Sequence, residues 1–385
     1  MKESILKDIL RPGYLCVQMI RSVFIYAIYI PFAAGIEIKQ PRIWFYKFIT
    51  VSFKYSMASL LREFVKAEIC CTKEYSLKKT TPEIIVICVV RNDLERVKIF
   101  LEHHRTLGIQ HFAFFDDQSN DGTKEFLAMQ DDVALFEDKQ RFTSLRKVAW
   151  INRITAYYGL NQWYLVLDSD ELLIYDNCEN NNIFYFLQYL KNNNISACSG
   201  IMLDMYSSDT LMPAHTDTSE NIYAKLNYFD KTGYYFNHRK KNQPCIVYGG
   251  FRYRYFRTGG LLCKTPLFYL DKQAVYTTPH NVFPIKKNFE MINGLVLLHY
   301  KFLPHDYNNY NERVKDKNMY GKSREYRQYI DVWNTKKEFC FYDKDVSEKY
   351  ENSQTLIKYN FIKHLNGHGQ AHNPPWMADC EPRKG

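Results

Sequence analysis

Residues 163–171 read WYLVLDSDE, an apolar run that ends in three acidic residues within four positions. The uninterrupted apolar part predicts a buried β-strand. In an extended segment, side chains two positions apart point to the same side, so we expect Asp168 and Asp170 to present their carboxylates together. Two such carboxylates suit a divalent cation, whereas the simpler alternative is an acidic turn that only faces solvent.

The chain before this run alternates short apolar segments with amphipathic ones. Gly108 and Gly159 supply stops for two of the amphipathic segments. Four strands separated by three helices are typical of a mostly parallel sheet, so the sequence predicts an α/β, Rossmann-like fold with flanking helices. The predicted strands cover residues 83–90, 111–117, 133–137 and 163–171, and the predicted helices begin near residues 94, 121 and 144.

Polar residues gather where these predicted strands end. Open parallel sheets bind ligands beyond the carboxyl ends of their strands, so the three groups are expected to share one edge. In FFDDQSNDGT (114–123), a helix cap accounts for the turn residues but not for two adjacent carboxylates, which can accept hydrogen bonds from a base or a ribose. The groups are Arg91, Asn92 and Asp93, then Asp116 and Asp117, then Asp168, Asp170 and Glu171.

Three motifs in this order and spacing, VVRND (89–93), FFDDQSNDGT and WYLVLDSDELLIY (163–175), resemble family 2 glycosyltransferases and related bacterial family 2-like proteins with the GT-A fold. The resemblance spans residues 83–305. It implies metal-dependent, inverting transfer of a sugar from a nucleotide diphosphate donor, most often a UDP-sugar, to a glycan or glycolipid acceptor. Mn²⁺ or Mg²⁺ is the implied cofactor, because it neutralises the departing diphosphate.

The resemblance also implies roles for individual residues. Asp168 and Asp170 match the DxD metal site. GLVLLHYKF (294–302) nominates His299 as a third metal ligand, and its alternative is a half-buried strand histidine. The implied nucleoside pocket comprises Arg91, Asn92, Asp93, Asp116 and Asp117.

Basic residues and one further carboxylate complete the predicted site. Arg146 and Lys147 begin the helix before the DxD strand, where they can face phosphate. GGFRYRYFRTGG (249–260) reads as a strand, which puts Arg252 and Arg254 on one face; a solvated face is the simpler reading for either basic group.

An inverting transferase also needs a carboxylate that deprotonates the acceptor. The sequence lacks the family's downstream Glu-Asp pair. Asp204 is the first candidate for this base, and Asp209 and Asp271 are the alternatives.

The amino-acid composition indicates which classes of binding partner to expect. The formal charge of +9 favours anions such as nucleotides, phosphorylated glycans or an acidic membrane surface. Nucleic acid is not expected, because no zinc-finger, leucine-zipper or RNP signature is present. The ten cysteines form no CxxC pair, which indicates reduced thiols in a cytoplasmic protein.

The sequence divides into a helical N-terminal region (1–79), the GT-A domain (80–305) and a helical, then irregular C-terminal extension (306–385). The apolar run SVFIYAIYIPFAAGI (22–36) is short for a membrane span and contains Pro31. It predicts a buried or interfacial helix, or alternatively an anchor at the cytoplasmic face of a membrane.

Two other functions fit parts of the pattern. Haloacid-dehalogenase-type phosphatases also carry DxD after an apolar strand, but on their earliest strand and with Thr or Val at the position that Leu172 occupies. A catalytically inactive GT-A-like binding module is the second alternative, and the intact acidic pair argues against it. The sequence specifies neither the donor sugar nor the acceptor.

Overall fold

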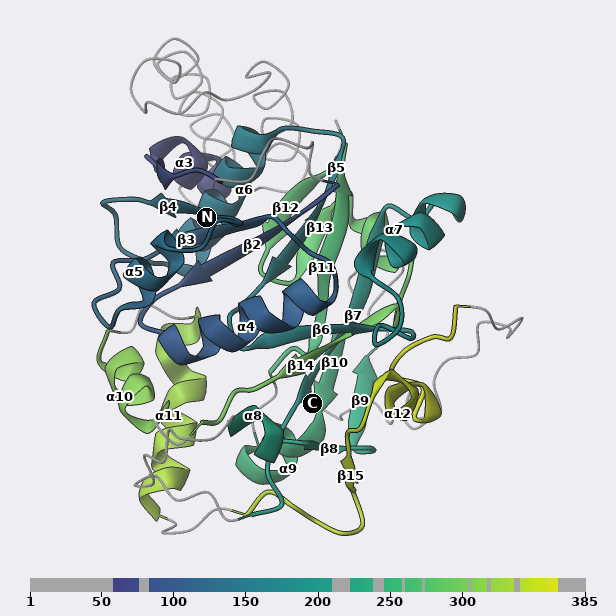
Figure 1. The fold of residues 1–385 in the computed structure, drawn as a ribbon. Helices are drawn as coiled ribbons and strands as arrows, with labels where there is room; N and C mark the ends of the chain where they lie inside the picture. Colours follow the sequence, from purple (N-terminus) through teal and green to yellow (C-terminus); the bar gives the residue numbers. More distant parts are fainter. Residues whose placement is uncertain are drawn as a thin grey trace, which may run out of the picture.

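A large mixed sheet forms the centre of the computed structural model (Figure 1). Its nine strands lie in the order β1-β4-β3-β2-β5-β11-β7-β14-β6. The structure describes residues 58–75, 83–209, 222–237, 246–257, 260–271, 274–303, 306–316, 320–335 and 340–365.

The first half of this sheet confirms the four predicted strands, because β4, β3, β2 and β5 are all mutually parallel neighbours. In the second half, β11 runs antiparallel to β5 and β7, β7 is parallel to β14, and β14 is antiparallel to β6. The strands are β1 (Cys70–Lys73), β2 (Ile84–Val90), β3 (Phe112–Asp116), β4 (Val133–Glu137), β5 (Gln162–Leu167), β6 (Glu171–Tyr175), β7 (Ala197–Asp204), β11 (Cys263–Leu270) and β14 (Leu295–His299).

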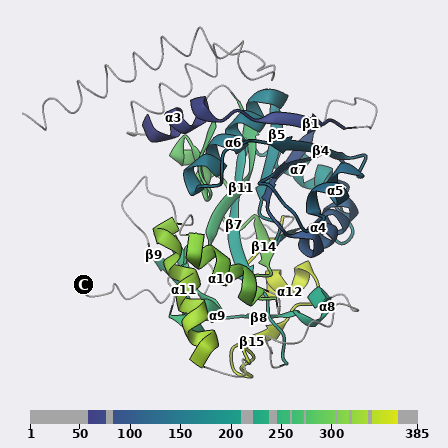
Figure 2. The same ribbon diagram turned by 90° about the vertical axis from the view of Figure 1, so that its left-hand side faces the viewer.

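Helices cover both faces of the sheet, as Figure 2 shows from the side. The α/β class is therefore confirmed. Thr143 accepts a hydrogen bond from the Arg146 amide and so caps the start of α6, which ends before Gly159 at φ 100°. One face carries α4 (Leu94–Thr106), α5 (Thr123–Ala128) and α7 (Ile183–Asn192), and the other carries α3 (Ala58–Lys66) and α6 (Ser144–Tyr158).

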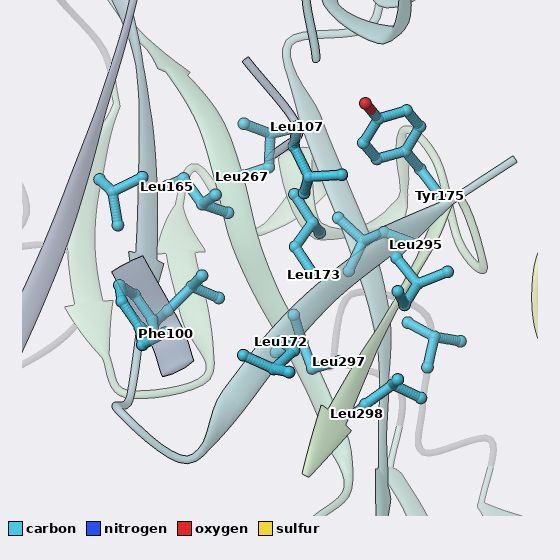
Figure 3. Close-up of a cluster of buried hydrophobic side chains, with 14 of the residues drawn as sticks. Phe100, Leu107, Leu165, Leu172, Leu173, Tyr175, Leu267, Leu295, Leu297 and Leu298 are labelled. Atoms are coloured by element: carbon cyan, nitrogen blue, oxygen red, sulfur yellow. The ribbon is translucent and has the colours of Figure 1, made fainter. Parts of the chain in front are cut away.

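Successive side chains of β2 point to opposite faces of the sheet and so contribute to two apolar cores. Val86 belongs to the core under α4, and Ile87 belongs to the core under α6. On the α6 side, Trp150 stacks on Phe115 with ring centroids 3.9 Å apart. Figure 3 shows part of the core under α4, with Phe100 of α4 near Leu165 of β5 and leucines of β6, β11 and β14 in the same cluster. These cores fix the strand ends that carry the polar residues.

The strand predicted at 163–171 is wrong at its end. β5 stops at Leu167, Asp168 to Asp170 form a turn, and Glu171 begins β6. Because β6 pairs with β14 and not with β5, the turn carries the chain past the ends of β11, β7 and β14. Asp168 and Asp170 therefore do not share the face of one strand.

The strand predicted within GGFRYRYFRTGG is also wrong, because Gly250–Phe256 form helix α9. Gly249 adopts φ 135°, and a Cβ there would lie 2.3 Å from the carbonyl oxygen of Gly233. This close approach bends the chain out of β10 (Ile246–Gly249) and into the helix. On a helix, residues two apart point in different directions, so Arg252 and Arg254 do not form one basic face.

A third, mainly aromatic core lies among α9, α10, α11 and the chain after β14. β12 and β13 instead pack into the core under α6. The remaining elements are α8 (Ile222–Lys225), β8 (Tyr228–Asp230), β9 (Tyr234–Asn237), β12 (Val275–Thr278), β13 (Asn281–Phe283), a 3₁₀ turn η1 (Ile285–Phe289), α10 (Asp306–Asp316), α11 (Tyr320–Thr335), β15 (Ser347–Lys349) and α12 (Ser353–Lys358).

The region predicted as a separate N-terminal unit reaches into the main fold. β1 pairs antiparallel with β4 at the sheet edge, and α3 packs on α6. The apolar run at 22–36 lies outside the described residues. Within the described ranges, no helix has both the length and the apolar character needed to cross a membrane.

Candidate functional site

The turn between β5 and β6 is fixed by its own backbone and by two neighbouring loops. The Asp168 amide donates to Glu171 Oε2 at 2.9 Å, and the Tyr300 amide donates to the Asp170 carbonyl at 2.8 Å. The Ser169 hydroxyl donates to Asp93, which lies in the loop after β2. The turn is thereby held at the carboxyl ends of the parallel strands, where ligands of such sheets bind.

Asp168 contacts two lysines from different elements. Lys147 Nζ of α6 binds Asp168 Oδ1, and Lys264 Nζ of β11 lies 3.7 Å from Asp168 Oδ2. Burial raises the pKa of Asp168, but the two ammonium groups outweigh it and lower that pKa overall. The side chain of Asp168 remains 38% exposed, so the carboxylate is open to a ligand.

Lys264 was missed by sequence reasoning. It is 3% exposed and donates to Glu171 Oε2 at 2.6 Å. A buried lysine requires a paired charge, and Glu171 supplies it. The signal in the sequence was a lysine within CKTPLFYL (263–270), an otherwise apolar strand.

Asp170 lies at the start of a chain of charged contacts. His299 Nε2 lies 3.3 Å from Asp170 Oδ2, and His299 Nδ1 lies 2.5 Å from Asp204 Oδ1. Burial lowers the pKa of His299, but the charge of Asp170 and the hydrogen bonds to Asp170 and Asp204 raise it to about 9. His299 is therefore held as an imidazolium between two carboxylates.

Asp204, the first candidate for the base, is closed off from an acceptor. Its side chain is 3% exposed, with Oδ1 bonded to His299 and Oδ2 accepting from Arg252 Nε at 2.6 Å. A general base must reach the proton that it removes. In this position Asp204 orients His299. The prediction that Asp204 deprotonates the acceptor directly is therefore corrected.

The two alternative carboxylates are far apart in the fold. Asp271 follows β11, which runs antiparallel to β5, so Asp271 lies at the opposite edge of the sheet, paired with Lys287 at 2.9 Å. That position corrects its nomination as a base. Asp209 is exposed and lies five positions beyond the end of β7.

The side chains at the β5–β6 turn provide some, but not all, features of a site for a divalent cation. A metal-ligating histidine usually gives its second ring nitrogen to a carboxylate, as His299 does with Asp204, and its first nitrogen faces Asp170. Two carboxylates and an imidazole are a ligand set that Mn²⁺ accepts. Asp168, however, is bonded to Lys147, and within the described ranges no three His, Cys, Asp or Glu side chains form a ready-made metal cluster.

Hydrogen bonds connect the loop after β2 to the loop after β3. The Asn92 amide donates to Ser119 Oγ at 2.9 Å, and Asn92 Oδ1 accepts from the Asn120 amide at 2.8 Å. Asn92 adopts φ 51°, a conformation that asparagine tolerates better than most residues. Asn92 thus shapes the predicted nucleoside pocket by fixing its loops.

Asp116 and Asp117 lie buried at the end of β3, where the sequence predicted them. Asp116 Oδ2 accepts from the Ser119 amide at 3.0 Å, whereas its Oδ1 is buried with no hydrogen-bond partner. Burial raises the pKa of Asp117 to about 6, against the opposing charge of Arg91 at 3.8 Å. The unsatisfied oxygen of Asp116, and the half-exposed Arg91 beside Asp117, are groups suited to hydrogen-bonding a ligand.

Arg146 does not reach this site. It contacts Glu63 of α3 at 3.1 Å and the Arg141 carbonyl. Consecutive residues on a helix point about 100° apart, so Lys147 faces the turn while Arg146 faces α3. Of the two basic residues at the start of α6, Lys147 therefore contacts Asp168 and Arg146 does not.

A buried network joins Asp93 to the C-terminal helices. Arg96 contacts Asp93 at 3.1 Å, the Tyr300 carbonyl at 3.1 Å and Asp306 of α10 at 2.5 Å. Asp93 also binds Ser169 of the turn. The structure therefore makes Asp93 a support for the turn, which differs from its predicted place in the nucleoside pocket.

No family model matches the sequence, and no curated protein sequence matches it. Among solved structures, a mannosyltransferase from Pyrobaculum calidifontis, in complex with GDP-Man and Mn²⁺, is 15% identical over 40% of this chain and 45% of its own, with a TM-score of 0.25. A 4-diphosphocytidyl-2C-methyl-D-erythritol synthase is 13% identical over 37% of this chain and 66% of its own, with a TM-score of 0.21. Likenesses this distant assign no activity to the chain.

Proposed function

We propose that this chain is a glycosyltransferase with the GT-A fold, which transfers a sugar from a nucleotide diphosphate donor to a glycan or glycolipid acceptor. One observation carries the proposal. The β5–β6 turn presents Asp168 and Asp170 among Lys147, Lys264 and His299 at the carboxyl edge of the parallel strands. A mixed cluster of this kind can bind a diphosphate together with its counter-ion.

The nucleoside is proposed to lie over β2 and β3. Asp116 Oδ1, buried and unsatisfied, accepts a hydrogen bond from the base or the ribose. Arg91 is 45% exposed and lies beside Asp117, so it can cover the ligand. Uridine is the expected base from the sequence motifs.

The metal is proposed to be Mn²⁺ or Mg²⁺, held by Asp168, Asp170 and His299, whose Nε2 proton would leave when the metal binds. When bound, it neutralises charge on the departing diphosphate. Asp204 then keeps the metal-facing nitrogen of His299 aimed at Asp170.

Lys147 and Lys264 are proposed to assist the leaving group. Both ammonium groups lie within 4 Å of Asp168, at the place where the diphosphate meets the turn. Fixed positive charge at that point stabilises the negative charge that develops during transfer. Asp209, exposed beyond β7, remains the candidate that deprotonates the acceptor.

The test is a calorimetric titration of the full chain with UDP, with and without Mn²⁺, followed by a donor-hydrolysis assay over a panel of nucleotide sugars. Mn²⁺-dependent UDP binding with hydrolysis of one donor supports the proposal. Absence of UDP binding, together with hydrolysis of phosphate esters, would favour the phosphatase. UDP binding without turnover of any donor and acceptor pair would favour the inactive module.

We also propose that the protein works in the cytoplasm, bound peripherally or anchored at the cytoplasmic membrane face through its basic, aromatic N-terminal region. Residues 1–57 lie outside the described residues, so the support is compositional. The full chain should pellet with liposomes containing anionic lipid more than a chain lacking residues 1–57. Equal pelleting of both would contradict this placement.

A further inference from the structure

Two basic side chains from distant parts of the chain converge on the hydroxyl of Tyr326. Lys301 Nζ, just after β14, lies 3.4 Å from Tyr326 Oη, and Arg313 Nη1, from α10, lies 3.0 Å from the same oxygen. Both cations also lie over the Tyr326 ring, at 5.2 Å and 5.3 Å from its centroid. The tyrosine thus holds two positive charges together.

Among the described residues, neither cation has a carboxylate within ion-pair distance. The other basic residues of this region are paired, Arg96 with Asp306 and Arg252 with Asp204, whereas Lys301 and Arg313 make no ion pair within the described ranges. In the same ranges, Tyr326 is the only residue that accepts a hydrogen bond from the ammonium of Lys301 or the guanidinium of Arg313. Half-buried cations with no carboxylate at ion-pair distance are costly, so this pair is suited to an anion from outside the chain.

The remaining donors of Arg313 are open to such an anion. Within the part of the chain that the structure describes, its Nε and Nη2 atoms have no hydrogen-bond partner, and they are not among the buried unsatisfied atoms. A guanidinium offers two parallel N–H groups, which match the oxygens of a phosphate, and a lysine adds a point charge.

The pKa of Tyr326 is consistent with the position of its hydroxyl between two cations. Burial raises the pKa of Tyr326, but the charges of Lys301 and Arg313 outweigh it and lower that pKa overall. Both basic groups carry their charge at neutral pH.

The cation pair lies beside the site already described. Lys301 is two residues beyond His299, and Tyr300 between them donates its amide to the Asp170 carbonyl. Asp170 and Lys301 also influence each other's pKa. An anion bound by Lys301 and Arg313 is therefore a neighbour of Asp170.

We infer that Lys301 and Arg313 form a subsite that binds a phosphate group next to the β5–β6 turn. Its role in transfer rests on the proposed function, whereas its affinity for phosphate does not. The phosphate belongs either to the donor diphosphate or to a phosphorylated acceptor, and both present the same tetrahedral oxyanion. Tyr326 holds the two cations at a common point when the subsite is empty.

The first test is calorimetric titration with inorganic phosphate, in a Lys147→Gln background so that Lys147 does not contribute. Lys301→Gln and Arg313→Gln should each weaken binding about tenfold or more, because each removes a charge-assisted contact. Lys315→Gln and Arg324→Gln are matched controls, since Lys315 is exposed on α10, which carries Arg313, and Arg324 is exposed on α11, which carries Tyr326; both should leave binding within about twofold. Lys301→Arg and Arg313→Lys keep the charge and should retain most of the affinity.

The inference is overturned if the parent protein does not bind phosphate, or if the Gln variants bind it as tightly as the parent while remaining folded by circular dichroism. Asp168→Asn should still bind phosphate, which separates this result from failure of the proposed transferase. Titration with UDP then identifies the source. Weaker UDP binding in both Gln variants assigns the subsite to the donor, and unchanged UDP binding assigns it to a phosphate on the acceptor.

Discussion

Nδ1 of His299 lies 2.5 Å from Oδ1 of Asp204, although the two residues are 95 positions apart in the sequence. The contact follows from the parallel pairing of β14 with β7, which sets His299 directly beside Asp204. It turns the opposite ring nitrogen towards Asp170. Because of this contact, substitution of His299 should affect both the stability of the fold and the function of the site.

The raised pKa of His299 predicts a loss of stability at alkaline pH. Its pKa is about 9 in the folded chain and 6.5 in an unperturbed histidine, so the stabilisation is complete below pH 6.5 and is lost as the pH rises through 9. The difference corresponds to at most about 3 kcal/mol. Urea unfolding in metal-free buffer between pH 6 and 10 measures it, and His299→Gln should flatten that part of the profile. An unchanged profile in the variant would refute the assignment.

Asp168→Asn and Asp170→Asn should each reduce donor turnover by about 100-fold or more, because each removes a carboxylate ligand of the proposed metal, which neutralises charge on the departing diphosphate. The turn is exposed in part, so both variants should keep their circular dichroism spectrum. Asp345→Asn, on an exposed loop, is the matched control and should remain active. A folded double variant with full turnover would exclude both residues from catalysis.

Arg252→Met should destabilise the fold by about 3–5 kcal/mol, because it leaves the buried Asp204 without its guanidinium partner. Adding Asp204→Asn removes the uncompensated charge and should recover part of that loss. Urea denaturation of the two single variants and the double variant gives the coupling energy. Additive effects would mean that the ion pair contributes no coupling.

Gly200→Ala should destabilise the protein by about 3 kcal/mol or more. A Cβ at Gly200 would lie 2.0 Å from the Leu295 carbonyl oxygen, in the pairing of β7 with β14 that positions Asp204 and His299. Gly233→Ala is the control, because it meets nothing within 4 Å and carries only the strain of φ 81°. Thermal unfolding of both variants compares the two costs, and equal shifts would contradict the close approach.

The sequence by itself determined the strands and helices from residue 83 to Leu167. These strands are mainly apolar runs, and glycines follow α4 and α6 closely, so local pattern and burial agree. It also placed Asp116, Asp117, Asp168 and Asp170 at one edge of the sheet, because parallel strands bring their carboxyl ends together.

Only the tertiary structure determined which residues form ion pairs with one another. Lys147 rather than Arg146 faces Asp168, because helix geometry separates adjacent side chains and the packing of α3 selects the direction of each. Asp204 pairs with His299 because β7 and β14 are neighbours, a long-range pairing that no local pattern encodes. Arg252 reaches Asp204 because two glycines allow a helix where alternation predicted a strand, and their positive φ angles depend on contacts with β9.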